Sequence, residues 1–348
     1  MSTELSVPMR DRIEAETTGV VASAPPNATE RRIVRSLCEP LLEYIPASIH
    51  PNTISLFTHA LVWITAGFAI ASASLTGLPR SLALIAAGVG MFVSMIGDCL
   101  DGMHARRTNQ CTKLGEMMDH WLDALVVPLV TMGSTVALQM DPWAVVLVNV
   151  TAAMVYHSQL VVYHHTGEFV DPEPTNGMEA QLGLSLGYLG IATLFYFVDP
   201  QTHWIRFAVM LIAFAGLYVQ MKCNYSYYKR MGRWFARHLI FVGMGSAFGV
   251  LYLMGAMDMY GFLATILFVS FRICGAYVVN TIIRRDYDGN DFGVVAFLVA
   301  IAAAKWLLPP LAIAGTTLLA LLPYAACAYM LARNTFDFVR HYPTLRGA

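Results

Sequence analysis

The sequence predicts an all-α, polytopic membrane protein with about ten transmembrane helices. Of its 348 residues, 57% are hydrophobic and only 13% are charged, and the mean hydropathy is +0.55. A soluble domain of ordinary composition does not expose so much apolar surface. About ten stretches also have the roughly 17 to 25 largely apolar residues that a helix needs to cross a bilayer. The formal net charge is −1, so the composition does not favour a nucleic-acid partner.

An amphipathic segment precedes the predicted spans. Residues 1–30 are polar and are typical of a disordered cytosolic tail. Residues 31–48 place apolar side chains on one face and arginines on the other, which predicts an interfacial helix on the membrane surface. A surface helix that caps the bundle would show the same pattern. The spans are predicted near 53–77, 81–100, 119–139, 142–163, 182–198, 203–221, 236–256, 259–281, 291–307 and 310–332.

The basic residues predict the orientation of the chain. Of the 22 Lys and Arg residues, 18 precede the first span, follow the second, sixth or eighth, or follow the tenth. An even number of spans places all of these segments on one side of the membrane. The positive-inside rule then predicts that both termini, and the loop after the second span, are cytosolic.

Acidic side chains gather where the second predicted span ends and the third begins. Asp98 and Asp101 are one helical turn apart, and so are Asp119 and Asp123. Two facing helices could therefore bring four carboxylates to one point. Four carboxylates at close range repel one another unless cations neutralise them, and Mg²⁺ or Mn²⁺ takes oxygen ligands of this kind.

Residues beside these aspartates fit a phosphate ligand. Gly102 and Ala105 are small and lie on the same helical face, which leaves room for a bulky substrate. Arg106 offers the planar fork that binds phosphate oxygens. The pattern favours a two-metal site for a diphosphate. Solvated loop charges are the alternative, but so many acidic groups at the edge of a membrane bundle are costly without a function.

The spacing D-x2-D-G-x2-A-R-x8-G-x3-D-x3-D from Asp98 to Asp123 resembles the signature of the CDP-alcohol phosphotransferase family at every fixed position. The resemblance implies a six-helix catalytic core within residues 49–222 and two Mg²⁺ or Mn²⁺ ions. It also implies which side chains bind them: Asp98, Asp101, Asp119 and Asp123 hold the metals, and Gly102, Ala105 and Arg106 contact the CDP moiety.

Further runs are similar to the choline/ethanolamine phosphotransferase branch of that family. They are ARRTN, LGE and DH within the signature region, IPASIHPNTIS before it and YHHTGEFVDPEPTNGMEAQ after it. Asn52 matches an asparagine that in the family lies by the nucleotide. The resemblance implies transfer of a phospho-alcohol from CDP-choline or CDP-ethanolamine to a lipid hydroxyl such as diacylglycerol, with release of CMP. Trp121 and Leu122 depart from the small pair usual in the branch, which leaves the alcohol open.

A base must accept the proton of the lipid hydroxyl. Glu116 and His120 are four residues apart and could form a hydrogen bond, so a histidine oriented by a glutamate is one candidate. This looks like the arrangement proposed for the branch. Asp123 is the competing candidate, although a carboxylate that binds a metal is a poor base.

The C-terminal segment, residues 223–348, is predicted to serve dimerisation or lipid access. The family forms dimers through membrane helices, and small residues in GMGSAFG (243–249) allow close helix approach. Two other functions remain open at this point. A transferase that uses CDP-diacylglycerol and a soluble alcohol would need the same signature but gives Glu116 and His120 no role. A cation transporter would place acidic groups or broken helices in mid-membrane.

Overall fold

Helices form all the regular secondary structure in the computed structural model, which describes residues 28–287, 289, 291–307 and 315–346. This confirms the all-α class. Among the described residues, eight helices, α4 to α11, are long and apolar enough to cross a membrane. The long helices are α4 (Pro51–Ser72), α5 (Gly77–Thr108), α6 (Lys113–Ala137), α7 (Pro142–Thr166), α8 (Gly177–Phe197), α9 (His203–Met231), α10 (Phe235–Leu253), α11 (Met259–Ile282), α12 (Phe292–Leu307) and α13 (Gly315–Arg346).

The ninth and tenth predicted spans correspond to α12 and α13. At 16 residues, α12 is shorter than the other long helices. The tenth predicted span, 310–332, begins outside the described residues, and the described part of this region belongs to α13. The number of predicted spans therefore exceeds the eight helices that meet the length and composition of a membrane span.

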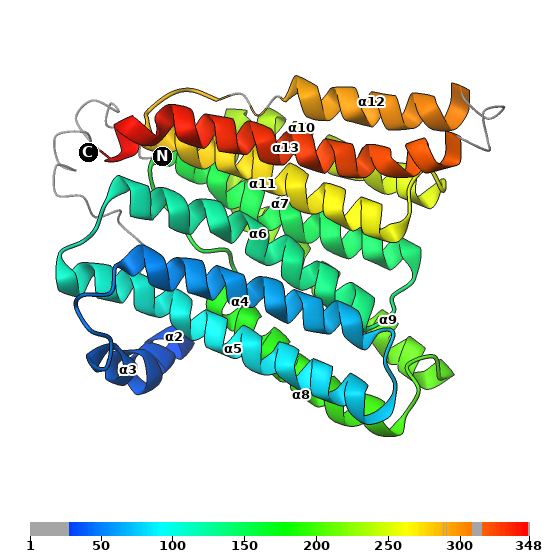
Figure 1. Cartoon of the computed structure of the whole chain (residues 1–348), viewed down its shortest axis with the longest axis horizontal. Coiled ribbons are helices and arrows are strands. Elements are labelled where there is room, and N and C mark those ends of the chain that lie inside the picture. The colour runs from blue at the N-terminus through cyan, green and yellow to red at the C-terminus, as the bar shows by residue number, and fades with distance from the viewer. Residues whose placement is uncertain (1–27, 288, 290, 308–314, 347–348) are drawn as a thin grey trace, which may run out of the picture.

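The helices form a bundle with α6 and α7 in its middle (Figure 1). On one side, α4 packs against α5 and α6, and α5 packs against α8. On the other side, α11 packs against α6, α7 and α13, and α12 packs against α13. The helices of the predicted catalytic core therefore share a continuous interior with the C-terminal helices, mainly through α6 and α7.

Helix α5 is longer than the span predicted for it. It continues to Thr108 and ends at Asn109, whose φ of 55° is left-handed. Helix α6 begins after Thr112, whose Oγ1 accepts a hydrogen bond from the Gly115 N–H at 3.0 Å. The hydropathy pattern ended near residue 100 because charged residues begin there, whereas the backbone helix continues until these capping residues. All four aspartates consequently lie on helices rather than on a loop.

The N-terminal segment forms three short helical pieces beside α5: α2 (Ala28–Ile33), a π-helical turn (Val34–Cys38) and α3 (Glu39–Glu43). Cys38 is buried against apolar side chains of α5. Arg107 of α5 donates hydrogen bonds to the backbone carbonyls of Leu42 and Ile45. The predicted interfacial helix is therefore attached to the end of α5. Of the predicted tail, residues 1–27 lie outside the described residues.

Helices α4 and α5 approach each other closely at two glycines. A Cβ atom added to Gly90 would lie 2.4 Å from Thr65 Oγ1, and one added to Gly97 would lie 2.4 Å from Thr58 Oγ1. Both distances are shorter than any ordinary contact. Small residues of this kind let membrane helices pack backbone to backbone. This packing brings α4 against the turn of α5 that carries Asp98.

The glycines of α10 serve a contact within the chain. A Cβ atom added to Gly249 would lie 2.5 Å from Val146 Cγ1 of α7, and one added to Gly245 would lie 3.4 Å from Val150 Cγ1. The sequence had suggested these residues as support for a dimer interface. The structure uses Gly245 and Gly249 to pack α10 on α7, whereas a Cβ atom added to Gly243 meets nothing within 4 Å.

We expect Gly90→Ala to lower the free energy of unfolding by about 1–3 kcal/mol, because the added methyl group would overlap Thr65 and force the helices apart. The thermal unfolding midpoint of the purified protein in detergent measures this loss. Gly67→Ala on α4 is the matched control, since a Cβ atom there meets nothing within 4 Å. Adding Thr65→Ala to Gly90→Ala should recover most of the loss. Equal midpoints for the two glycine variants would contradict the close packing.

Candidate metal centre

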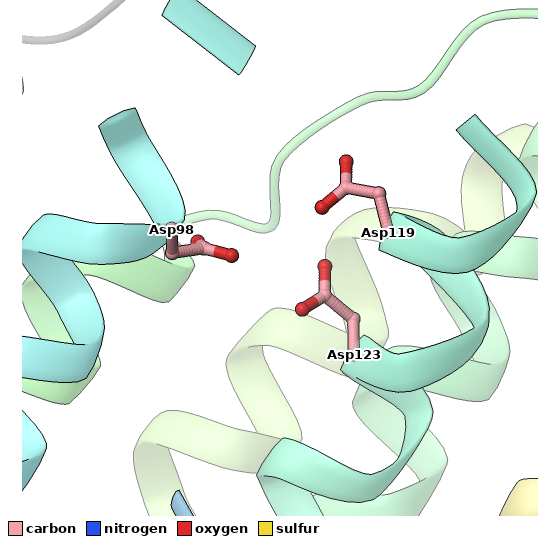
Figure 2. A group of neighbouring side chains, drawn as sticks. All are labelled: Asp98, Asp119 and Asp123. Atoms are coloured by element: carbon pink, nitrogen blue, oxygen red, sulfur yellow. The ribbon is translucent and has the colours of Figure 1, made fainter. Parts of the chain in front are cut away.

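Three of the four predicted metal ligands meet at the junction of α5 and α6. Asp98 extends from α5, and Asp119 and Asp123 extend from successive turns of α6. One carboxylate oxygen of each lies within 4.8 Å of the others, and all three residues are half-buried. Figure 2 shows the three carboxylates directed toward a common space between the two helices. Together they form the acidic cluster of this protein.

Asp101, the fourth predicted ligand, has a different environment. Its side chain is buried, and Ser55 Oγ of α4 donates a hydrogen bond of 2.6 Å to its Oδ2. Asp101 lies one turn from Asp98 but outside the group of three. The structure therefore anchors one oxygen of this carboxylate to α4.

His59 of α4 also borders the acidic cluster, and reasoning from the sequence missed it. The residue is 5% exposed, its Nδ1 lies 2.8 Å from the Ser55 carbonyl oxygen, and its Nε2 lies 3.4 Å from Asp123 Oδ1. The signal that could have found it is the pair Ser55 and His59, polar side chains one turn apart in an otherwise apolar span. Ionisable residues inside membrane segments usually have a function.

The predicted nucleotide-binding residues lie at the same end of the bundle. Arg106 is exposed on α5, and its guanidinium passes over Gly102, where an added Cβ atom would lie 3.4 Å from Arg106 Nη1. Ala105 is half-buried on the same helix. Asn52, in the first turn of α4, places its Oδ1 3.2 Å from a Cβ atom added to Gly115. Gly102, Ala105 and Arg106 therefore follow Asp98 toward the end of α5, and Asn52 lies beside the first turn of α6.

Glu116 and His120 do not form the predicted hydrogen bond among the described residues. Instead, the hydroxyl of Tyr163 on α7 donates to Glu116 Oε1. The His120 ring stacks on Phe169 with a centroid distance of 4.3 Å, and its Nδ1 is buried without a hydrogen-bond partner. The glutamate is therefore positioned by α7, and the histidine by the loop that follows α7.

Trp121, the residue that departs from the family pattern, points toward α11. Its Nε1 donates a hydrogen bond of 3.2 Å to the Phe271 carbonyl oxygen, and the ring stacks on Phe271. A Cβ atom added to Gly275 would lie 2.0 Å from Trp121 Nε1. The tryptophan thus fills a notch that Gly275 provides in α11, and its bulk contacts this helix rather than the three carboxylates.

The chemistry of these donors fits a hard divalent cation. Three half-buried carboxylates within 4.8 Å of one another repel strongly, and a divalent ion with oxygen ligands would neutralise them. The buried Nε2 of His59 has no hydrogen-bond partner among the described residues and lies beside the same group. A buried polar atom without a partner is costly, so a ligand at this point would satisfy it.

Comparison with known proteins agrees with the geometry. Residues 48–219 match the family model of the CDP-alcohol phosphatidyltransferases. Cholinephosphotransferase 1 of Rattus norvegicus is 34% identical over 101 residues, which cover 29% of this chain and 25% of that protein. Cholinephosphotransferase 1 of Gallus gallus is 36% identical over 115 residues, covering 30% of this chain and 34% of that protein.

A CDP-alcohol phosphatidyltransferase class-I family protein of Schizosaccharomyces pombe, itself uncharacterized, is 27% identical over 130 residues, with 36% of this chain and 33% of that protein covered. The chain thus spans about a quarter to a third of the length of these relatives. The matched region includes α4 to α8, the whole acidic cluster and His59. Residues 48–219 of this chain therefore form a CDP-alcohol phosphatidyltransferase domain, as the resemblance of its signature implies.

Proposed function

We propose that this protein transfers phosphocholine or phosphoethanolamine from CDP-choline or CDP-ethanolamine to the hydroxyl of a lipid such as diacylglycerol, and releases CMP. The observation that carries the proposal is the convergence of Asp98, Asp119 and Asp123 between the apolar helices α5 and α6. The names of the cholinephosphotransferase relatives support the choice of substrates.

The carboxylates would hold two Mg²⁺ or Mn²⁺ ions, with Asp101 contributing its second oxygen. Such ions, when bound, supply positive charge to the diphosphate and to the oxygens of the transferred phosphoryl group. Arg106 is exposed beside them and would bind a phosphate with its two parallel N–H groups. Gly102 has no side chain, so it leaves space for the substrate on this face of α5. Asn52 would orient the nucleotide.

His120 is the proposed general base. Its Nδ1 is buried and has no hydrogen-bond partner among the described residues, so it can accept the proton of the lipid hydroxyl. The lipid oxygen then forms a bond to the phosphorus that carries the alcohol. The bond from that phosphorus to the bridging oxygen breaks, and CMP leaves with this oxygen. Glu116, held by Tyr163, would stabilise the positive charge on His120.

We place the active site and both termini on the cytosolic side, because most of the basic residues lie on one side of the predicted spans. We also propose a homodimer, mainly by analogy with the family, since Gly245 and Gly249 of α10 pack within the chain. Mass measurement in mild detergent should give a particle that contains two 38.3 kDa chains. A particle of one chain would refute the dimer.

An assay with two substrate pairs tests the proposed function. Purified protein is offered CDP-choline or CDP-ethanolamine with diacylglycerol, and separately CDP-diacylglycerol with free choline, ethanolamine or other alcohols. We expect phospholipid and CMP from the first pair, and loss of both when EDTA removes divalent ions, with recovery on addition of Mg²⁺ or Mn²⁺. Product from the second pair alone would favour the CDP-diacylglycerol enzyme. Absence of product from both pairs would favour the cation transporter.

Asp119→Asn should reduce transfer to below about a tenth of the wild-type rate, because losing one ligand charge at a metal site usually costs several kcal/mol of transition-state stabilisation. Asp141→Asn is the matched control. Asp141 lies at the start of α7, at the other end of α6, where it pairs with Arg206. Both variants should unfold at similar temperatures. A rate for Asp119→Asn close to that of the control would refute the ligand assignment.

His120→Ala should lower turnover by about 10²- to 10⁴-fold, the usual contribution of a general base, while the KM for the CDP-alcohol stays nearly constant. Glu116→Gln should act in the same direction with a smaller effect. His203→Ala, at an exposed position that begins α9, is the control and should retain full turnover. Initial rates over a range of CDP-alcohol concentrations separate the two parameters. A raised KM with unchanged turnover would assign His120 to substrate binding instead.

A further inference from the structure

We propose that His59 of α4 is a metal ligand, and that its Nε2 binds the same divalent ion as Asp123. This inference rests on the proposed function for the presence of a metal, and it adds a nitrogen donor from a third helix. The site would then combine carboxylates of α5 and α6 with an imidazole of α4. With this imidazole as a ligand, the site should bind Mn²⁺ in preference to Mg²⁺.

The hydrogen bonds of His59 determine which nitrogen is available. Nδ1 lies 2.8 Å from the carbonyl oxygen of Ser55, one turn earlier on the same helix. Because a carbonyl oxygen can only accept, Nδ1 carries a proton. In the neutral ring, Nε2 then has a free lone pair. Ligating histidines are commonly held in this way, with the second ring nitrogen donating to a backbone carbonyl.

The position of Nε2 fits a shared ion. It lies 3.4 Å from Asp123 Oδ1, and among the described residues it has no hydrogen-bond partner although its side chain is buried. Two donor atoms at adjacent corners of an octahedron, each about 2.1 Å from the ion, are about 3.0 Å apart. A shift of a few tenths of an ångström would bring the two atoms to that separation.

The backbone of α4 keeps the His59 ring beside Asp123. Thr58, the residue before His59, packs on Gly97 of α5, next to Asp98. Ser55 connects both sides of the site, since its hydroxyl donates to Asp101 while its carbonyl accepts from His59. A displacement of His59 would therefore disturb the α4–α5 contact as well. Contacts within α4 and between α4 and α5 therefore position the imidazole.

A nitrogen donor changes which metal the site prefers. Mg²⁺ favours oxygen ligands, whereas imidazole suits the transition metals. The competing explanation is that His59 is doubly protonated and forms an ion pair with Asp123, in which case Nε2 carries a proton and cannot ligate. Both arrangements agree with the 3.4 Å distance between His59 Nε2 and Asp123 Oδ1. Only direct ligation, however, transfers electron spin from a bound Mn²⁺ ion to the imidazole nitrogen.

Electron spin echo spectroscopy of Mn²⁺ bound to the full-length protein in detergent tests the proposal. The wild type should show modulation from a directly bound imidazole nitrogen, and His59→Gln should lose it. His120→Gln is the matched control, because His120 of α6 also has a buried ring nitrogen, Nδ1, and is followed by Asp123 one turn later; this variant should keep the modulation. Mn²⁺ affinity should fall at least about tenfold in His59→Gln, while Mg²⁺ affinity changes less.

The outcomes separate this inference from the proposed function. Bound Mn²⁺ without nitrogen modulation in an active wild-type protein would overturn the role of His59 and leave the transferase proposal standing. Modulation that persists in His59→Gln but disappears in His120→Gln would transfer the role to His120 and also overturn the inference. Failure of the protein to bind Mn²⁺ would refute the role of His59, and failure to bind either Mn²⁺ or Mg²⁺ would refute the proposed function as well. Nitrogen modulation in a protein that releases no CMP would retain the ligand and refute the proposed function.

Discussion

Repulsion among crowded carboxylates is the constraint on which the rest of this structure depends. Two carboxylates 4.8 Å apart repel by about 3 kcal/mol at an effective dielectric constant of about 20. Asp98, Asp119 and Asp123 all lie within that distance of one another. Such a group persists only if the surrounding helices are held together by other contacts. The close packing of α4 on α5 and the capped junction between α5 and α6 supply them.

Helix α4 supports the carboxylates of both neighbouring helices. Its Ser55 donates to Asp101 of α5, and its His59 lies beside Asp123 of α6. Glycines on α5 allow this approach, since larger residues at their positions would meet the threonines of α4. The small residues thus matter for the site as much as for stability, because they decide how near the polar side chains of α4 come to the acidic cluster.

The predictions from sequence were correct for features that depend on a single helix. Apolar length predicts that a segment forms a helix, and the spacing within one signature predicts that Asp119 and Asp123 share a face. Hydropathy misplaced the end of α5, because helical hydrogen bonds continue through the charged residues up to Asn109. The pairing of Tyr163 with Glu116 was not predictable, since these residues are 47 positions apart and the contact depends on how α7 packs.

Contacts between helices also explain which residues were interpreted incorrectly from the sequence or were missed. Trp121 departs from the small residue usual in the branch, and Gly275, 154 positions later, accommodates it. The α10 glycines suggested a dimer interface because a local sequence pattern does not show that α10 packs on α7. His59 lies outside the signature, and although it forms a polar pair with Ser55 in the sequence, only its burial beside Asp123 connects it with the acidic cluster. Each case needs a contact between helices that no local periodicity encodes.

The location of the acidic cluster also explains how a soluble and a lipid substrate could meet. Asp98 lies ten residues before the end of α5, and Asp119 and Asp123 lie six and ten residues after the start of α6, so the proposed CDP-alcohol would enter from the side of the α5–α6 turn. One turn along α4 from Asn52, Leu56 and Phe57 expose large apolar side chains on the outside of the bundle. A lipid that lies against these residues would keep its chains in the membrane while its hydroxyl reached the level of Ser55. Under the proposed function, transfer would take place at the membrane surface, and neither substrate would have to leave its own phase.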